Sequence, residues 1–211
     1  MLKEKDKMEI RILKAATEVF LEKGYAGTNM TLIAQAAGIN RPALYYYFRT
    51  KDRIFNELFG LMVKSFIPRL LEILNSNDPM EVRLERFVDS YFEQLSKEPR
   101  LPIFILRENF RDPEFLLKTV FDLNLENYFS ELRLTYEKEV SLGNLKEVPP
   151  FAILYTCLGQ IVFPFLTKPF VQTVFVGNQE KPWVVASDFN SLMTMWKPYV
   201  VKSLKSLLFA R

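Results

Sequence analysis

Two short helices joined at a glycine are predicted by residues 31–51, which read Thr31-Leu-Ile-Ala-Gln-Ala-Ala-Gly-Ile-Asn-Arg-Pro-Ala-Leu-Tyr-Tyr-Tyr-Phe-Arg-Thr-Lys51. Asn29 is expected to cap the first helix, because its side-chain oxygen can accept a hydrogen bond from a free backbone N–H group. Gly38 follows this helix, at a position where a left-handed backbone suits glycine. Asn40 is expected to cap the second helix, and Pro42 lies in its first turn, where no N–H donor is needed.

The second of these helices has an apolar inner face and a small or polar outer face. Leu44 and Phe48 are four residues apart, so both are expected to face inward. The residues that remain outside or at the flanks are Pro42, Ala43, Tyr45, Tyr46 and Tyr47. Two helices joined by a tight glycine turn, the second with such an outer face, are typical of a helix-turn-helix.

The distribution of charge favours a DNA-binding function for this region. Residues 1–60 contain 10 Lys and Arg against 7 Asp and Glu, a net charge of +3, whereas residues 61–211 contain 18 of each. No Asp or Glu occurs between Lys23 and Lys51. Because affinity for nucleic acids comes largely from neutralised phosphates, an acid-free basic segment is what a DNA-binding surface requires.

Three motifs in this region resemble the DNA-binding domain of TetR-family transcriptional regulators. They are Gly27-Thr-Asn-Met, Ile33-Ala-Gln-Ala-Ala-Gly-Ile-Asn-Arg-Pro-Ala-Leu-Tyr-Tyr-Tyr-Phe and Thr50-Lys-Asp-Arg-Ile-Phe. The preceding helix, which ends near Gly24-Tyr25, is similar to that family's first helix. The resemblance covers residues 8–60, and its most specific part is the Leu-Tyr-x-x-Phe helix followed at once by Thr-Lys-Asp at a new helix start.

The resemblance implies that nine residues contact DNA. Arg41 would pair with a base or a phosphate, and Pro42 and Ala43 would lie close to the bases. Tyrosine hydroxyls would donate to phosphates, and Lys51 would bind phosphate at the start of the next helix. The full set is Thr31, Asn40, Arg41, Pro42, Ala43, Tyr45, Tyr46, Tyr47 and Lys51.

Some of these positions have alternatives. Tyr45 could instead pack against the first helix, and Arg49 could touch a phosphate or remain a solvated charge. Asn40, Tyr47 and Asp52 stand where Ser, His and Glu are common in the family. Asn40 can still cap its helix, whereas Tyr47 leaves open which base or phosphate is contacted.

The composition excludes several catalytic devices. The chain has 211 residues, of which 49% are hydrophobic and 25% charged, as in an ordinary globular protein. It has no His, so the commonest general base and metal ligand is missing and no Ser–His or Cys–His pair can form. The single cysteine, Cys157, excludes a disulfide within the chain and fits a reducing cytosol. We therefore expect no enzyme activity, no metal and no cofactor.

Neither an export signal nor a membrane span is expected. Residues 1–7 are charged and no apolar stretch follows them, which is not the pattern of a signal peptide. No apolar run reaches the ~20 residues that a membrane span needs. The longest candidate, residues 151–165, is too short and contains Gln160 and Pro164. These features predict a cytoplasmic protein without membrane contact.

The rest of the chain is predicted to be helical, with Pro marking most helix starts. Thr50 is expected to cap a helix that runs to about Asn75, and Asp78-Pro79-Met80-Glu81 to form a capping box with Pro at the first helical position. Further helices are expected over 79–97, 101–111, 113–140, 149–166 and 188–209, with Gly143 ending the third of these and a loop containing Gly177-Asn178 and Lys181-Pro182 preceding the last.

These elements predict an all-α protein of about nine helices, without strands. Three helices would form an N-terminal helix-turn-helix DNA-binding domain, residues 1–50. About six would form a helical ligand-binding and dimerisation domain, residues 51–211. The number and order of the helices match the architecture that the TetR resemblance implies.

Aromatic residues are concentrated in the second domain, where 15 of the 19 Phe lie after residue 60. They could simply form a packed core. The resemblance implies instead a cavity for a small apolar or amphipathic effector. Arg107 could pair with an anionic group of the effector, or only with a neighbour on its own helix at the surface. The candidate lining residues are Phe66, Tyr91, Phe104, Arg107, Phe110, Tyr128 and Phe163.

A homodimer is expected, because one recognition helix reads few base pairs and two symmetric half-sites would form an inverted repeat. The apolar helices 149–166 and 188–209 are the predicted interface, although they could instead be central core.

The leading hypothesis is a sequence-specific, double-stranded-DNA-binding transcriptional regulator, a repressor that a small-molecule effector releases. The alternative is a helical protein-interaction module that no longer reads DNA. Arg41, the three tyrosines and Lys51 favour the first. Salt-sensitive retention on a random-DNA column would separate the two.

Overall fold

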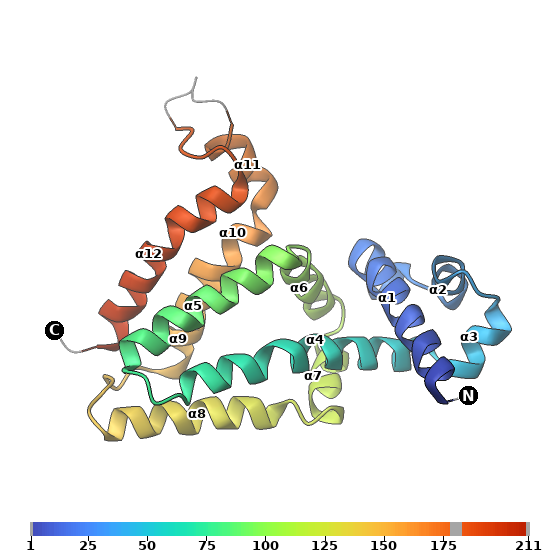
Figure 1. Ribbon diagram of the computed structural model, residues 1–211, viewed down its shortest axis with the longest axis horizontal. Helices are drawn as coiled ribbons and strands as arrows, with labels where there is room; N and C mark the ends of the chain where they lie inside the picture. The colour runs from blue at the N-terminus through green and yellow to red at the C-terminus, as the bar shows by residue number, and fades with distance from the viewer. Residues whose placement is uncertain (1, 178–182, 210–211) are drawn as a thin grey trace. The chain divides into compact units, whose positions relative to one another are not determined.

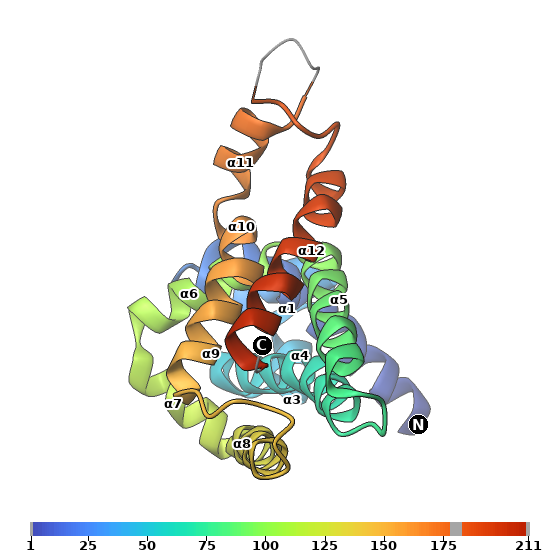
Figure 2. The same ribbon diagram turned by 90° about the vertical axis from the view of Figure 1, so that its left-hand side faces the viewer.

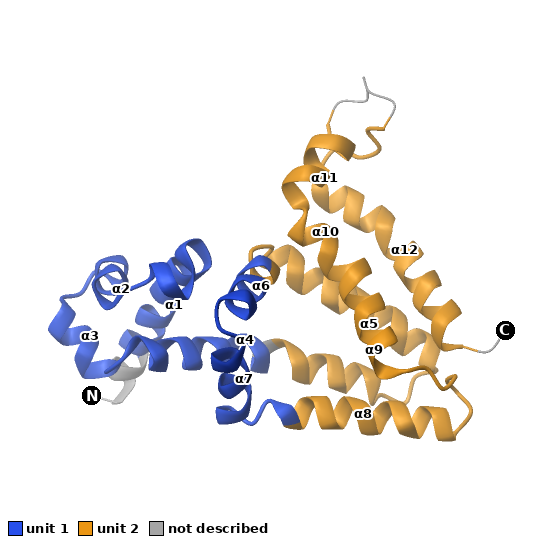
Figure 3. Cartoon of the chain, turned by 180° about the vertical axis from the view of Figure 1, so that it is seen from behind, with its two compact units in different colours: residues 1–65, 103–126 blue, residues 66–102, 127–211 orange. Residues whose placement is uncertain are grey.

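The computed structural model describes residues 2–177 and 183–209, and within these ranges the chain is helical, as predicted. Counting α9 (Pro150–Cys157), the π-helical turn η1 (Leu158–Val162) and α10 (Phe163–Leu166) as one continuous helix, the described residues form eleven helices rather than about nine. Two compact units can be distinguished (Figure 3). Unit 1 comprises residues 1–65 and 103–126, and unit 2 comprises residues 66–102 and 127–211.

Unit 1 contains the N-terminal helices, which are coloured blue in Figure 1, together with two helices from later in the chain. Its core is formed by apolar side chains that are almost fully buried, among them Ile12, Phe20, Ile33, Leu44, Phe48, Phe55 and Phe104. Its helices are α1 (Leu2–Gly27), α2 (Met30–Ala37), α3 (Arg41–Tyr47), the first part of α4 (Lys51–Leu74), most of α6 (Leu101–Arg111), and α7 (Pro113–Asp122).

The caps predicted around the glycine turn are confirmed. The Asn29 side chain accepts a hydrogen bond from the N–H of Leu32 at 2.9 Å, and that of Asn40 accepts one from Ala43 at 2.8 Å. Gly38 has a left-handed backbone with φ of 63°. The Thr50 hydroxyl accepts from the N–H of Arg53 at the start of α4. Short-range signals thus place α2, α3 and α4 correctly.

Unit 2 is built around α5 (Met80–Lys97) and α12 (Phe189–Leu208), which pack against each other and against the α9–η1–α10 helix (Figure 2). It also contains most of α8 (Glu126–Ser141) and α11 (Lys168–Phe175). The inner face of α5 is apolar, since Leu84, Val88 and Leu95 are buried and Phe87 and Tyr91 pack against the same core. From the facing helices this core receives Ile161, Phe165, Met193, Val200 and Leu204.

The single helix predicted over residues 113–140 is wrong. α7 ends at Asp122 and α8 begins at Glu126. Between them Asn124 has a left-handed backbone with φ of 52°, and the N–H of Leu125 donates to the carbonyl of Val120 at 2.9 Å. Asn tolerates this conformation better than most residues, and the break lets Leu125 enter the core, where it is 1% exposed.

The capping box at Asp78 is also wrong. α5 begins one residue later than predicted, so that Pro79 is the N-cap and no side chain caps this end. The Asp78 carboxylate instead accepts a hydrogen bond from the Ser76 hydroxyl and forms an ion pair with Arg86. The carboxylate therefore contacts two side chains and no backbone N–H group at the start of α5.

The segment expected to be a loop after residue 166 contains a helix. α11 follows a bend at Thr167, and Pro169 lies in its first turn. Gly177 does lie outside the helices, whereas Asn178 and Lys181-Pro182 are outside the described residues. Among the described residues, no helix alone has the length and apolar composition of a membrane span; only Pro150–Leu166 combined with Lys168–Phe175, which are bent by 73°, meets that test.

Candidate nucleic-acid interface

The outer face of α3 is exposed above a buried inner face. Leu44 and Phe48 are 0% and 1% exposed, whereas Tyr46 is 75% and Tyr45 39% exposed. Arg41 and Pro42 are also exposed, as are Asn40 before α3 and Thr31 on α2, while Ala43 and Tyr47 are partly buried. The inner residues hold α3 on the core of unit 1, and so the outer side chains are presented together.

Two contacts organise this outer face. The Arg41 guanidinium donates to the Tyr45 hydroxyl at 3.1 Å, and its carbon lies 5.4 Å from the centre of the Tyr45 ring. The Tyr46 and Tyr47 rings meet edge to face at 5.2 Å. Arg41 and Tyr45 are four residues apart on one side of the helix, so they present a cation and a hydroxyl side by side.

Lys51 has contacts within the protein that the sequence analysis missed. Its ammonium donates to the carbonyls of Tyr25 and Thr28, each at 3.0 Å, and lies 3.9 Å from the centre of the Tyr25 ring. Desolvation by burial is the main cause that lowers the pKa of Lys51. Lys51 therefore fastens the end of α1 to the start of α4, and the two carbonyls engage two of the three N–H donors of its ammonium.

Arg11 was also missed. Its guanidinium donates to the carbonyl of Gly38 at 3.3 Å, across 27 residues of sequence. It lies on α1 beside the glycine turn and is exposed. The only sequence signal was a basic residue near the start of the family resemblance, and that signal does not reveal a contact with the turn.

The predicted effector residues are divided between the two units. In unit 2, Phe66 and Tyr91 meet edge to face at 4.9 Å, and burial raises the pKa of Tyr91 to about 12. Tyr128 is half-buried, and Phe163 is 57% exposed. Of the seven, the structure thus brings Phe66 and Tyr91 together within this unit.

The remaining three lie in unit 1 and do not form a cluster. Phe104 is 1% exposed and packs against Phe55, whereas Phe110 is 79% exposed. Arg107 is exposed, and its guanidinium occupies the space where a Cβ on Gly24 would lie. The neighbouring Glu108 points instead to the end of α1 and to Arg111.

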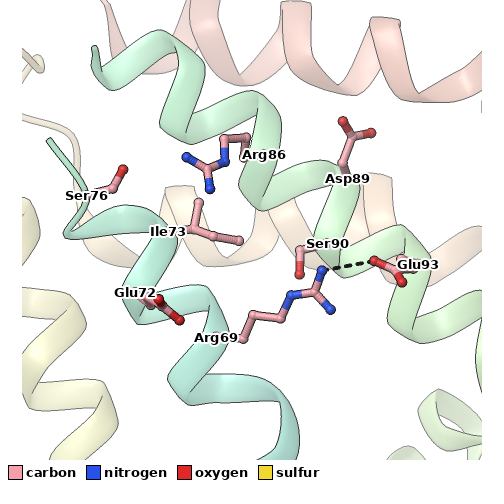
Figure 4. Close-up of a pocket in the computed structure, with 8 residues that line it drawn as sticks. All are labelled: Arg69, Glu72, Ile73, Ser76, Arg86, Asp89, Ser90 and Glu93. Carbon is pink, nitrogen blue, oxygen red and sulfur yellow. Dashed lines mark hydrogen bonds and ion pairs between the residues drawn. The ribbon is translucent and has the colours of Figure 1, made fainter. Parts of the chain in front are cut away.

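A pocket of about 360 Å³ lies between α4 and α5 in unit 2 (Figure 4). Its lining is mainly polar and includes Arg69, which is paired with Glu93 at 3.2 Å, and the buried hydroxyl of Ser90, for which the described residues supply no hydrogen-bond partner. A second pocket, of about 640 Å³, is lined by Tyr136, Val140 and the segment 147–150. The predicted effector residues line neither of these two pockets.

The exposed helix α3 lies over a buried apolar core, follows a glycine turn and carries Arg and Tyr on its outer face. This arrangement defines a helix-turn-helix DNA-binding protein. Residues 12–58 match the family described as "Bacterial regulatory proteins, tetR family". This match, together with the relatives and the solved structure described below, supports a TetR-family transcriptional regulator that binds DNA. Regulators of this family bind operators, dimerise, respond to small molecules and are generally not enzymes.

Whole-chain similarity extends the comparison beyond this region. The chain is 26% identical over 194 residues to the fatty acid metabolism regulator protein of Bacillus subtilis, covering 92% of this chain and 96% of that protein. It is 24% identical over 195 residues to the uncharacterised regulator YhgD of the same organism, covering 92% and 95%. A TetR-family regulator from Marinobacter aquaeolei has the same fold, with a TM-score of 0.70 and 18% identity over the full length of both chains.

Proposed function

We propose that the protein is a repressor that binds an inverted-repeat operator through α3 and that a small effector releases. The exposed face of α3 above the buried Leu44 and Phe48 carries this proposal. Residues 1–50 would read DNA, and residues 51–211 would bind the effector and dimerise. The location that fits this role is the cytoplasm, where operator DNA is found.

Each outer residue has a defined role in the proposal. Arg41 donates to the acceptor edge of a guanine, and Pro42 and Ala43 contact thymine methyl groups. Tyr46 and Tyr47 donate to phosphates together with Thr31, while Asn40, whose side-chain oxygen caps α3, and Tyr45, which holds Arg41, support this face. Lys51 offers its remaining N–H donor to a phosphate.

The exposed faces of two helices support a homodimer. The α9–η1–α10 helix and α12 each bury one side in the core of unit 2, yet the opposite sides expose large apolar residues: Phe151, Leu154, Tyr155, Phe163, Met195 and Tyr199. One face of each helix therefore belongs to the central core, and the opposite face fits a dimer interface, so each of the two interpretations given for these helices applies to one face. A monomer seldom leaves so many apolar side chains together in water, and so we assign the exposed faces to a second copy.

The effector is proposed to be a fatty acid or a related acyl compound. This proposal rests on the name of the Bacillus subtilis relative, the fatty acid metabolism regulator protein. The aromatic group formed by Phe66, Phe87 and Tyr91 in unit 2 offers apolar surface of the required kind.

The test begins with selection of duplex DNA from a random pool, followed by titration of the selected operator. Arg41→Ala should weaken operator binding by ~1–3 kcal/mol and relax specificity at one base pair. Arg133→Ala, an exposed arginine of α8, serves as the charge-matched control. Unchanged affinity and unchanged specificity in the Arg41 variant would refute the assignment of α3. If acyl compounds stabilise the protein but never lower its affinity for the operator, the proposed class of effector is refuted.

A further inference from the structure

The end of α1 is shaped by a break in the helix at Gly24. Gly24 has φ of 69° and ψ of 176°, which interrupts the helical backbone three residues before α1 ends. The next N–H group, that of Tyr25, donates to the Glu108 carboxylate at 2.8 Å. Glu108 lies on α6, 83 residues further along the chain, and both residues belong to unit 1.

Glu108 is the most deeply buried carboxylate of the described residues, with 2% exposure. A buried carboxylate is unfavourable unless its oxygens are paired. One oxygen accepts from Tyr25, and the other accepts from the Arg111 guanidinium at 2.6 Å. The same guanidinium lies 4.3 Å from the centre of the Tyr25 ring. Glu108 and Arg111 together therefore hold both the backbone and the ring of one residue.

The end of α1 leads directly into the DNA-reading helices. The Thr28 hydroxyl donates to the carbonyl of Gly24 at 2.6 Å, and Asn29 caps α2 immediately afterwards. On the other side Lys51 holds the carbonyls of Tyr25 and Thr28. The position of α2 thus depends on a short segment that two helices hold. Lys51 of α4 contacts the backbone carbonyls of this segment, and Glu108 of α6 contacts its Tyr25 N–H group.

We propose that Glu108 is a positioning residue for DNA binding, which acts through Tyr25, and that α6 and α7 complete the DNA-reading unit. A charged acceptor forms a stronger hydrogen bond with a backbone N–H than a neutral one does. Removal of the carboxylate eliminates one of the two sets of contacts that hold the end of α1, and the placement of α2 and α3 becomes less fixed.

The proposal rests on the proposed function in one respect, because operator affinity is the property that the contact between Glu108 and Tyr25 supports.

The test compares three variants of the full chain. Glu108→Ala removes the acceptor, Glu108→Gln keeps a neutral acceptor, and Glu114→Ala is the control, because Glu114 is an exposed acid on the adjacent α7. Operator affinity, thermal unfolding, and hydrogen exchange of the Tyr25 amide by NMR are measured for each. We expect ~10-fold or greater loss of operator affinity and faster Tyr25 exchange in Glu108→Ala, partial rescue of both in Glu108→Gln, and no change in Glu114→Ala.

The proposal fails if the Tyr25 amide exchanges faster in a folded Glu108 variant while operator affinity stays at the wild-type value. It also fails if Tyr25 exchange is unchanged in both variants. Should Glu108→Ala not fold, Glu108→Gln alone decides between these outcomes. Failure of the proposed function is recognised separately, because wild-type protein would then show a protected Tyr25 amide but no effector-dependent change in operator binding.

Discussion

Single side chains in the proposed DNA-reading region have a structural role beside the proposed contact with DNA. Asn40 is exposed beside the proposed DNA surface, yet its side-chain oxygen caps α3. Arg41 is proposed to contact a base, and its guanidinium also donates to the Tyr45 hydroxyl. Substitutions at these positions will therefore change both the local structure and the contacts with DNA, and affinity measurements need stability measurements beside them.

Lys51 provides the clearest prediction of this kind. Lys51→Met removes a cation and two charge-assisted hydrogen bonds, so we expect unfolding to become easier by about 1.5–3 kcal/mol. If the remaining donor binds a phosphate, affinity falls for all DNA sequences and the salt dependence of binding becomes shallower by about one unit. Chemical denaturation and titrations at several salt concentrations measure both effects. A lower stability with an unchanged salt dependence would contradict the phosphate contact.

Helices are tied together by a buried ion pair in unit 2. The Arg83 guanidinium of α5 donates to Glu139 of α8 at 2.8 Å and to the carbonyl of Leu74, at the end of α4, at 2.7 Å. Asn144 donates to the second oxygen of Glu139 at 2.7 Å. Three helices and the turn after α8 thus meet at this ion pair, in which Arg83 and Glu139 are only 8% and 4% exposed.

This arrangement makes stability depend on pH. Burial alone would raise the pKa of Glu139, but hydrogen bonds from Arg83 and Asn144 outweigh burial and lower it. A lowered pKa in the folded state means that the stabilisation is complete above the unfolded value of about 4.3 and is lost as pH falls through the folded value.

Glu139→Gln should therefore destabilise unit 2 by ~3–5 kcal/mol at pH 7, because Arg83 is left without its counter-charge. The loss of stability on acidification should also be smaller than in the wild type. Urea denaturation at pH 7 and in acid measures both quantities. Glu137→Gln, on the exposed side of the same helix, is the control. An identical pH dependence in wild type and Glu139→Gln would rule out this role of the carboxylate.

The whole molecule is expected to function as a dimer through surfaces that do not stabilise the protomer. Tyr155 and Tyr199 are 69% and 64% exposed, so their replacement should leave the core of unit 2 intact. The double variant Tyr155→Glu, Tyr199→Glu should sediment as a monomer of 24.8 kDa and lose most operator affinity. Leu142→Glu, at a position 61% exposed just after α8, should remain dimeric. A wild-type monomer at micromolar concentration would contradict the proposed interface.

Sequence alone determined the elements whose signals are short-range. Asn29, Gly38 and Asn40 each act within four residues of their own position, so the ends of α2 and α3 could be predicted from residue type. The outer face of α3 followed from the same spacing, because Leu44 and Phe48 allow only one orientation. Family resemblance then connected this face to DNA.

Tertiary structure decided the features that depend on distant partners. Glu108 and Arg11 gained their contacts across 83 and 27 residues, and no periodicity encodes such pairs. The break at Asn124 arose because burial of Leu125 outweighs continuation of the helix, and the carboxylate of Asp78 went to Arg86 rather than to the backbone. Each of these arrangements is stabilised by contacts between residues that come together only in the folded chain.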